Sequence, residues 1–471
     1  MKRKKVLTGC MIVAVMLIIS SYLGIALFYT DGFTFGTWIN GIYCTGKSVG
    51  EVNRELISQT TYEQILVWYD SDYKEVLKFP EEMIELDYTD QLNRIFMQQN
   101  PFLWYRNIMA HNEEGLRGGY SISPSIIVKE DLLRQKIGQL TGVKAERARN
   151  KSVRFFLDDD AGYVFQNNKM HILDETRVFE QLLFAIQSQQ DALSLEETAC
   201  YYDEPLSENE KETADTAQRL LDFLDFTITY DMGDSDVVYD GAVMSHWIAT
   251  GENDLDFVLD ENRNFTWNME QVDQAVVELA DLYDSYGKPH TFQSTRGDLI
   301  TLENGTYGNE LDRKKETAFL EQAVLERKDV LRQPEYLRKA WAQGLNDIGD
   351  TYIEIDITQQ KMYFYQNGEC MIDTPVVTGN MMRKRETPEG VFYIYLKQKN
   401  RVLRGPGYAA HVDFWMPVKN GIGIHDALWR DEFGGEIYKT EGSHGCINTP
   451  HDVMEKLYDM AEIGMPVVIF Y

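Results

Sequence analysis

The chain has 471 residues and a formal net charge of −29, from 75 acidic and 46 basic residues. Its hydrophobic fraction of 44% excludes a largely disordered protein, and its length predicts more than one compact domain. The surplus of acidic residues excludes nucleic acid as the expected partner, because no excess of Lys and Arg exists to neutralise phosphates.

The first predicted element is an apolar segment near the N-terminus. Four basic residues at 2–5 precede an uncharged stretch at 6–29. About 20 apolar residues suffice to cross the hydrocarbon core of a bilayer, and the basic cluster favours the cytoplasmic side. We therefore expect residues 1–30 to be a cytoplasmic tip and a single transmembrane anchor, with the rest of the chain extracytoplasmic. A cleaved signal peptide is the alternative, but the stretch is long and lacks a small-x-small cleavage site.

Mixed helix and strand signals follow over residues 31–205. A helix is predicted at 48–57, where Val49, Val52 and Leu56 lie on one face. A second helix is predicted at 175–188, between segments that are typical of strands. These patterns predict a first α+β module.

An acidic, polar stretch at 203–215 is the best candidate for a boundary between modules. Beyond it, apolar spacing predicts a helix at 269–286. Strand and turn signals follow, and a further helix is expected at 313–326. We expect a second α+β module over 206–345.

The last segment, 346–471, is richer in strand signals than the segments before it. It contains several short runs that alternate or are apolar throughout, separated by Gly and Pro turns, and Gln366-Asn367-Gly368 is a hairpin signal. The strands are predicted at 352–357, 361–365, 376–379, 391–395, 421–425 and 467–471. This pattern predicts a mainly-β domain with a sandwich-like or barrel-like arrangement.

The motif Ser443-His444-Gly445-Cys446 is the strongest indication of catalytic function in the sequence. A free thiol has a pKa near 8.5, so a nucleophilic cysteine needs a base or a field that favours the thiolate. His425 ends a predicted strand, which is a rigid place for a general base. Gly445 allows a tight turn, and its amide and that of Cys446 are candidate donors to an oxyanion.

A helix after the cysteine is expected to assist the thiol. Thr449 is a suitable N-cap, Pro450 suits the first helical position, and Asp452 completes a Thr-x-x-Asp capping box. The positive end of such a helix would lie near the sulfur of Cys446 and lower its pKa.

Other roles of the cysteines are also considered. His425, His444 and Cys446 together are an alternative metal site, but no fourth ligand is evident and the spacing fits no common zinc pattern. Elsewhere, a disulfide among Cys44, Cys200 and Cys370 is undecided by spacing, and buried free thiols are the favoured state. Cys10, within the apolar stretch, is expected to be a membrane-buried thiol.

The segment 352–471 resembles the catalytic domain of L,D-transpeptidases, also called the YkuD domain. The resemblance rests on His425 with the Ser443–Cys446 phrase, and on a second signature, Thr378-Gly379 with Thr387-Pro388-Glu389-Gly390. Two departures are Asn448, where many members have Arg, and Asp426, where a glycine often follows the histidine. Asn at position 448 occurs in a Gram-positive subgroup.

The resemblance implies a bacterial cell-wall enzyme with catalytic Cys446 and His425. Its partners would be peptidoglycan stem peptides, and its product a 3→3 cross-link formed with release of D-Ala. Ser443, His444, Gly445 and Asn448 would shape the substrate and oxyanion site, with Ser443 and His444 orienting His425. The resemblance implies no cofactor and no catalytic metal.

Two alternatives use the same domain differently. Water in place of an acceptor amine would make a carboxypeptidase or endopeptidase, and a degenerate site would leave a non-catalytic wall-binding scaffold. Upstream, segments within about 121–336 resemble the wall-binding modules that accompany this domain. A spacer that holds the catalytic domain away from the membrane is the alternative for both middle modules.

Overall fold

The computed structural model describes residues 2–109, 119–405 and 408–471. The chain divides into two compact units. Unit 1 comprises Met1–Val153 and Gln166–Glu210, and unit 2 comprises Arg154–Phe165 and Lys211–Tyr471. The molecule is therefore multidomain, with helices and strands mixed in each unit.

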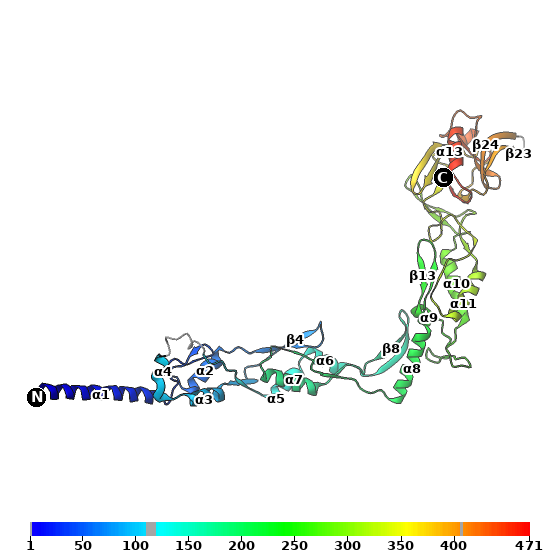
Figure 1. Ribbon diagram of the computed structural model, residues 1–471. Coiled ribbons are helices and arrows are strands. Elements are labelled where there is room, and N and C mark those ends of the chain that lie inside the picture. The colour runs from blue at the N-terminus through cyan, green and yellow to red at the C-terminus, as the bar shows by residue number, and fades with distance from the viewer. Residues whose placement is uncertain (1, 110–118, 406–407) are drawn as a thin grey trace. The chain divides into compact units, whose positions relative to one another are not determined.

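Unit 1 begins with a long apolar helix and continues with short helices and small sheets (Figure 1). Its elements are α1 (Lys2–Phe28), β1 (Trp38–Ile39), β2 (Ile42–Tyr43), α2 (Val49–Gln59), β3 (Gln64–Trp68), β4 (Lys74–Lys78), β5 (Ile84–Asp87), α3 (Thr89–Gln98), η1 (Pro101–Leu103), α4 (Trp104–Met109), β6 (Ser125–Val128), α5 (Glu130–Ile137), α6 (Thr141–Ala148), β9 (Ile172–Leu173), α7 (Glu175–Gln187), β10 (Ala192–Ser194) and β11 (Tyr201–Tyr202).

Helix α1 is long and apolar enough, over Leu7–Phe28, to cross a membrane by length and composition. Helix α2 coincides with a sequence prediction and shows why it forms. Ser48 and Glu51 make a reciprocal capping box, while Val52 and Leu56 are buried in the unit's smaller core.

Unit 2 includes most of a hairpin whose residues lie, in sequence, between the two segments of unit 1. The hairpin is formed by β7 (Val153–Asp158) and β8 (Gly162–Asn167). Further elements are α8 (Glu208–Phe223), β12 (Ile228–Asp231), β13 (Asp236–Tyr239), α9 (Gly241–Ser245), α10 (Met269–Tyr283), β14 (His290–Gln293), β15 (Leu299–Leu302), β16 (Glu310–Leu311), α11 (Arg313–Glu326), β17 (Val330–Arg332) and β18 (Tyr336–Arg338).

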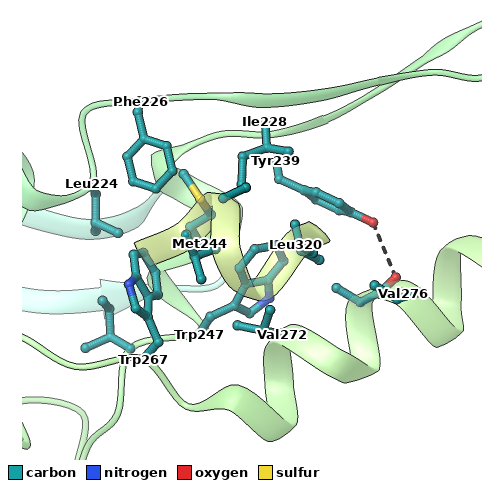
Figure 2. Packing of buried hydrophobic residues seen from close by; sticks show 14 of the residues in the cluster. Leu224, Phe226, Ile228, Tyr239, Met244, Trp247, Trp267, Val272, Val276 and Leu320 are labelled. Carbon is teal, nitrogen blue, oxygen red and sulfur yellow. Dashed lines mark hydrogen bonds between the residues drawn. The ribbon is translucent and has the colours of Figure 1, made fainter. Parts of the chain in front are cut away.

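An aromatic-rich core holds this part of unit 2 together. Figure 2 shows Met244 and Trp247 of the α9 region packed among strand and helix residues, including Val272 of α10 and Leu320 of α11. Tyr239 also donates a hydrogen bond of 3.3 Å to the carbonyl of Ala275 in α10. Helix α11 has the bounds that its sequence pattern predicts, whereas α10 ends three residues before the predicted position.

The C-terminal part of unit 2 contains two sheets. Its elements are β19 (Tyr352–Asp356), β20 (Lys361–Gln366), β21 (Glu369–Pro375), β22 (Gly390–Tyr393), β23 (Gln398–Gly405), β24 (Tyr408–Lys419), β25 (Ile422–Asp426), α12 (Ile437–Glu441), β26 (Ile447–Thr449), α13 (His451–Met460) and β27 (Pro466–Phe470). One sheet has the strand order β21-β20-β19-β27-β22, and the other has the order β23-β24-β25-β26.

The five-stranded sheet is buried on both faces. In β27, Val467 and Ile469 pack in the core shared with the second sheet and α13. Val468 and Phe470 face a separate cluster that includes Phe292 from the β14–β15 hairpin. Because strand side chains alternate between faces, burial on both sides explains why β27 is apolar throughout.

Three local predictions need correction. The run 376–379 makes isolated β-bridges from Val377 and Gly379 rather than a continuous strand. Helix α13 begins at His451, so Thr449 ends a strand and Pro450 takes the cap position without a side-chain hydrogen bond. All five cysteines are free thiols, and Cys370 is exposed rather than buried because the edge strand β21 carries it.

Candidate active site

Two parallel strands position the candidate catalytic pair. In the register of β25 and β26, His425 lies beside Asn448. Cys446 directly precedes β26, two residues before Asn448, so it projects from the same face. His425 and Cys446 are therefore diagonal neighbours on one side of the sheet. Gly423, the residue opposite Cys446 by extension of this register, leaves that face without a side chain.

Trp415 contacts both members of the pair. It lies opposite His425 in the β24–β25 register, with 5.7 Å between ring centroids. It also packs with Cys446 and Val412 in a small apolar cluster. The indole thus covers the side chains that the strand register brings together.

Cys446 lines a cleft of about 720 Å³. Cys446 is 9% exposed, so only a small part of the residue is open to the cleft. Strands β23 and β24 form much of the wall, together with the segment that leads into β23. The lining residues are Tyr395, Leu396, Gln398, Asn400, Arg401, Val402, Leu403, Arg404, Trp415, Pro417, Gly421 and Cys446.

Burial controls the acidity of this thiol. It raises the pKa of Cys446 to about 11, and the Gly423 amide offsets only part of that effect. The expected lowering by a following helix is wrong, because β26 lies between Cys446 and α13. The resting group at neutral pH is the protonated thiol, so reaction requires a base.

His425 is held as a neutral imidazole. Its Nδ1 lies 2.7 Å from the carbonyl oxygen of Asp426, so Nδ1 carries the proton and donates it. Nε2 then accepts from the side-chain amide of Asn448 at 3.1 Å. Burial lowers the pKa of His425. Asp426 acts in the opposite direction, but its effect is smaller, so the pKa remains lowered. The lone pair available to take a proton is on Nε2.

The resting site does not contain a bond between thiol and base. Among the described residues, no hydrogen bond joins Cys446 Sγ to His425, and Sγ instead faces the Gly421 carbonyl at 3.8 Å. Catalytic hydrogen bonds are often loose before substrate binds. In this structure the acceptor atom of the imidazole, Nε2, is already hydrogen-bonded to the side-chain amide of Asn448.

The loop before Cys446 is fixed by one hydroxyl. Ser443 Oγ donates to the Cys446 carbonyl at 2.5 Å and accepts from the Gly445 amide at 3.0 Å. These bonds hold the loop, so Ser443 does not orient His425 as expected. Gly445 has φ of +114°, which a residue with a side chain would adopt only under strain. The Gly445 amide is already used within the loop.

The second sequence signature lies behind this loop. The Gly379 amide donates to Thr387 Oγ1, which in turn donates to the Gly445 carbonyl, each at 2.9 Å. A Cβ on Gly379 would lie 1.9 Å from the Arg385 carbonyl oxygen, so only glycine fits here. The two signatures are thus one connected structure.

Comparisons with known proteins identify a matching family model and similar solved structures. The family model of the L,D-transpeptidase catalytic domain, YkuD, matches residues 350–469. An L,D-transpeptidase crystal structure from Enterococcus faecium, a cysteine-to-serine mutant, is 32% identical and covers 54% of this chain and 100% of that chain, with a TM-score of 0.47. The catalytic domain of the E. faecium enzyme acylated by ertapenem is 44% identical over 26% of this chain and 98% of that chain, with a TM-score of 0.24.

The chain belongs to the L,D-transpeptidase family. The assignment rests on the family match and on 32% identity across the whole E. faecium chain in that crystal structure. No curated protein matches the chain.

One departure from the common L,D-transpeptidase pattern has a structural role here. Asn448 donates to His425 and also accepts from Arg430 Nε at 2.8 Å. Arg430 further donates to the carbonyl of Glu441, which fastens the loop before the cysteine. Asn448 therefore contacts the candidate base directly, through its side chain.

Sequence reasoning missed Arg430, Trp415 and Arg401. Arg430 lies in a loop with no periodic pattern, and Trp415 resembles any apolar strand residue. Only the strand pairing places them beside Asn448, His425 and the cleft. His444, which was predicted to orient His425, is an exposed residue, and partial desolvation and the nearby Arg385 lower its pKa.

Proposed function

We propose that this L,D-transpeptidase family member forms 3→3 peptidoglycan cross-links through a thioester on Cys446. The observation that supports the proposal is the placement of Cys446 and His425 on one face of the sheet at β25 and β26, with Cys446 lining a cleft. A thiol accessible from a cleft and a neutral imidazole beside it are the requirements of base-assisted acyl transfer.

In the first step, a donor tetrapeptide occupies the cleft with the carbonyl of its third residue over Sγ. The Asn448 amide leaves Nε2 of His425, which then accepts the thiol proton. Sγ attacks the carbonyl carbon and gives a tetrahedral oxyanion. The C–N bond to D-Ala breaks, the imidazolium returns the proton to the departing amine, and the thioester remains.

In the second step, an acceptor amine attacks the thioester carbonyl. His425 takes a proton from the attacking nitrogen, and the C–S bond breaks as the amide forms. The sulfur leaves as thiolate and takes the proton back from the imidazolium. The Cys446 amide is the proposed oxyanion donor, joined by that of Gly445 once its bond to Ser443 opens.

The charge of the cleft suits an anionic peptide. Arg401 and Arg404 of β23 line it, and the lining includes no acidic residue among those described. Guanidinium groups pair with carboxylates in a bidentate manner. We assign these two residues to the carboxylates of the stem peptides.

The cellular placement follows from the first helix. We propose that α1 anchors the chain in the cell membrane with residues 31–471 on the wall side, and that residues 346–471 form the catalytic domain. The modules at 31–205 and 206–345 would then contact the wall or act as spacers. The expected result is sedimentation with membranes, lost when residues 1–30 are removed.

Mass spectrometry of products from a disaccharide-tetrapeptide tests the reaction. A cross-linked dimer with loss of D-Ala is expected from the wild type and not from Cys446→Ala. Tripeptide as the sole product would assign a hydrolase instead. Absence of product from both proteins would leave the wall-binding scaffold.

A further inference from the structure

A group of candidate metal ligands includes Asp426, the residue that follows the candidate base His425 in the chain. Asp413 of β24, Asp426 at the end of β25 and His451 at the start of α13 offer ligand atoms that all lie within 4.8 Å of one another. His451 Nε2 is 3.0 Å from Asp413 Oδ2. The three residues come from three different elements, which only the fold brings together.

Asp426 is the unusual member of this group. Its side chain is fully buried, and Oδ1 accepts the Phe414 amide at 2.8 Å. Oδ2 is buried and has no hydrogen-bond partner among the described residues. Its neighbour across the β25–β26 register, Thr449, also has a buried hydroxyl oxygen without a partner.

Such oxygens are costly unless something binds them. A buried polar group without a partner costs about 1–3 kcal/mol, and a buried carboxylate costs more. The His451–Asp413 pair accounts for Asp413 but leaves Asp426 Oδ2 unsatisfied. The other charged groups at the cluster are His411, with Nδ1 3.6 Å from Asp413 Oδ1, and Asp452, 3.6 Å from His451 Nδ1 and almost fully exposed.

We propose that Asp413, Asp426 and His451 bind one divalent transition-metal ion, with Zn²⁺ as the best match. One imidazole and two carboxylates are zinc ligands at about 2.0–2.2 Å, which places ligand atoms roughly 3.5 Å apart around a tetrahedral ion. The existing separations need only small side-chain rotations. Asp413 and His451 are each about one third exposed, at 34% and 31%, which leaves a path for the ion and for a water as fourth ligand.

The ion would have a structural role beside the active site. It would tie α13 to β24 and β25 at the residue whose backbone carbonyl accepts from His425 Nδ1. Holding Asp426 in place would stabilise the tautomer that leaves Nε2 as acceptor. The ion takes no part in bond making or breaking.

The test is zinc binding by the full chain, purified in detergent with a histidine-free tag, stripped with chelator and dialysed against Zn²⁺. One zinc per chain is expected for the wild type. Glu455→Gln, on the exposed side of the same helix, and Cys446→Ala, which removes the thiol, should keep it. Asp413→Asn and His451→Gln should bind at least tenfold more weakly, with circular dichroism showing that they remain folded.

A second measurement does not depend on the variants. Co²⁺ in the wild-type site should give the visible spectrum of a tetrahedral ion without a thiolate charge-transfer band. Absence of zinc from the wild type would overturn the proposal. So would zinc that persists in both ligand variants, zinc lost from Cys446→Ala, or a thiolate band in the cobalt spectrum.

Discussion

The reactivity of Cys446 depends on its immediate surroundings. Trp415 and Val412 cover the side chain, and burial raises its pKa to about 11. A cysteine protease-like thiolate–imidazolium pair would need the opposite environment, a partly exposed and electropositive one. The residue is therefore a thiol at rest, and its proton must leave during the reaction.

The rate at which iodoacetamide alkylates Cys446 in the free enzyme measures how much of this residue is thiolate. Because the thiol pKa is raised, thiolate is scarce at neutral pH and increases with pH. The rate at Cys446 should rise about tenfold for each pH unit between 7 and 9. Peptide mapping separates this site from the exposed Cys370. A plateau near pH 7 would contradict the resting thiol.

Asn448 contacts the ring nitrogen of His425 that would accept a proton. In the wild type, burial lowers the pKa of the imidazole, so the base is neutral at pH 7 and acylation by a carbapenem should fall only in acid. Asn448→Asp would place a carboxylate on Nε2 and raise that pKa. The acid limb of the rate profile should then move to higher pH, with about a tenfold slower reaction at pH 6. An unshifted limb would show that Asn448 does not act on the base.

At the scale of elements, the site depends on how the turns before β22 and β26 are joined. Thr387, Gly379 and Gly445 form a chain of hydrogen bonds that connects the two loops. Around these loops, Val377 and Gly379 form isolated β-bridges rather than a continuous strand. Their geometry comes from side chain to backbone bonds, which take the place of a ladder.

Thr387→Val tests that connection. The valine removes an acceptor for the Gly379 amide and a donor to the Gly445 carbonyl, leaving both buried at a cost of about 1–3 kcal/mol each. Lower stability in urea and slower acylation of Cys446 are expected. Thr387→Ser keeps the hydroxyl and should retain most of both. Equal behaviour of the two variants would show that the hydroxyl is not what holds the loop.

At the scale of the whole molecule, unit 2 extends beyond the catalytic segment. The β14–β15 hairpin covers one face of the five-stranded sheet, where Phe292 packs with Phe470. Arg296 adds a bond to the carbonyl of Tyr471 and an ion pair with the buried Asp356. The catalytic part is therefore stabilised by residues that precede it in the chain.

A shortened chain of residues 346–471 should be less stable than the full chain. Removing the hairpin exposes Val391, Val468 and Phe470, and each buried side chain of this kind contributes roughly 1.5–3 kcal/mol. The expected result is a lower urea midpoint for unfolding of this part. Phe292→Ala in the full chain should reproduce part of the loss, with the exposed Leu299→Ala as control. Equal midpoints for the two chain lengths would show that the hairpin does not support the sheet.

The sequence by itself determined the features that depend on neighbours in the chain. The helices α2 and α11 and the Asn-Gly turn after β20 are local features, and each lies within two residues of its predicted position. The Ser443–Cys446 phrase with His425 was also sufficient to propose the chemistry. The start of α13 was misplaced because Thr449 pairs in β26, a contact that capping preferences do not anticipate.

Only the tertiary structure decided how the site is assembled. The pairing of β24, β25 and β26 packs Trp415 against Cys446 and places Asn448 within hydrogen-bond distance of His425. The fold also brings Asp413, Asp426 and His451 together. These residues are far apart in sequence and come from strands of ordinary composition. Burial, which raises the thiol pKa, depends on packing from several strands at once and has no signature in a single segment.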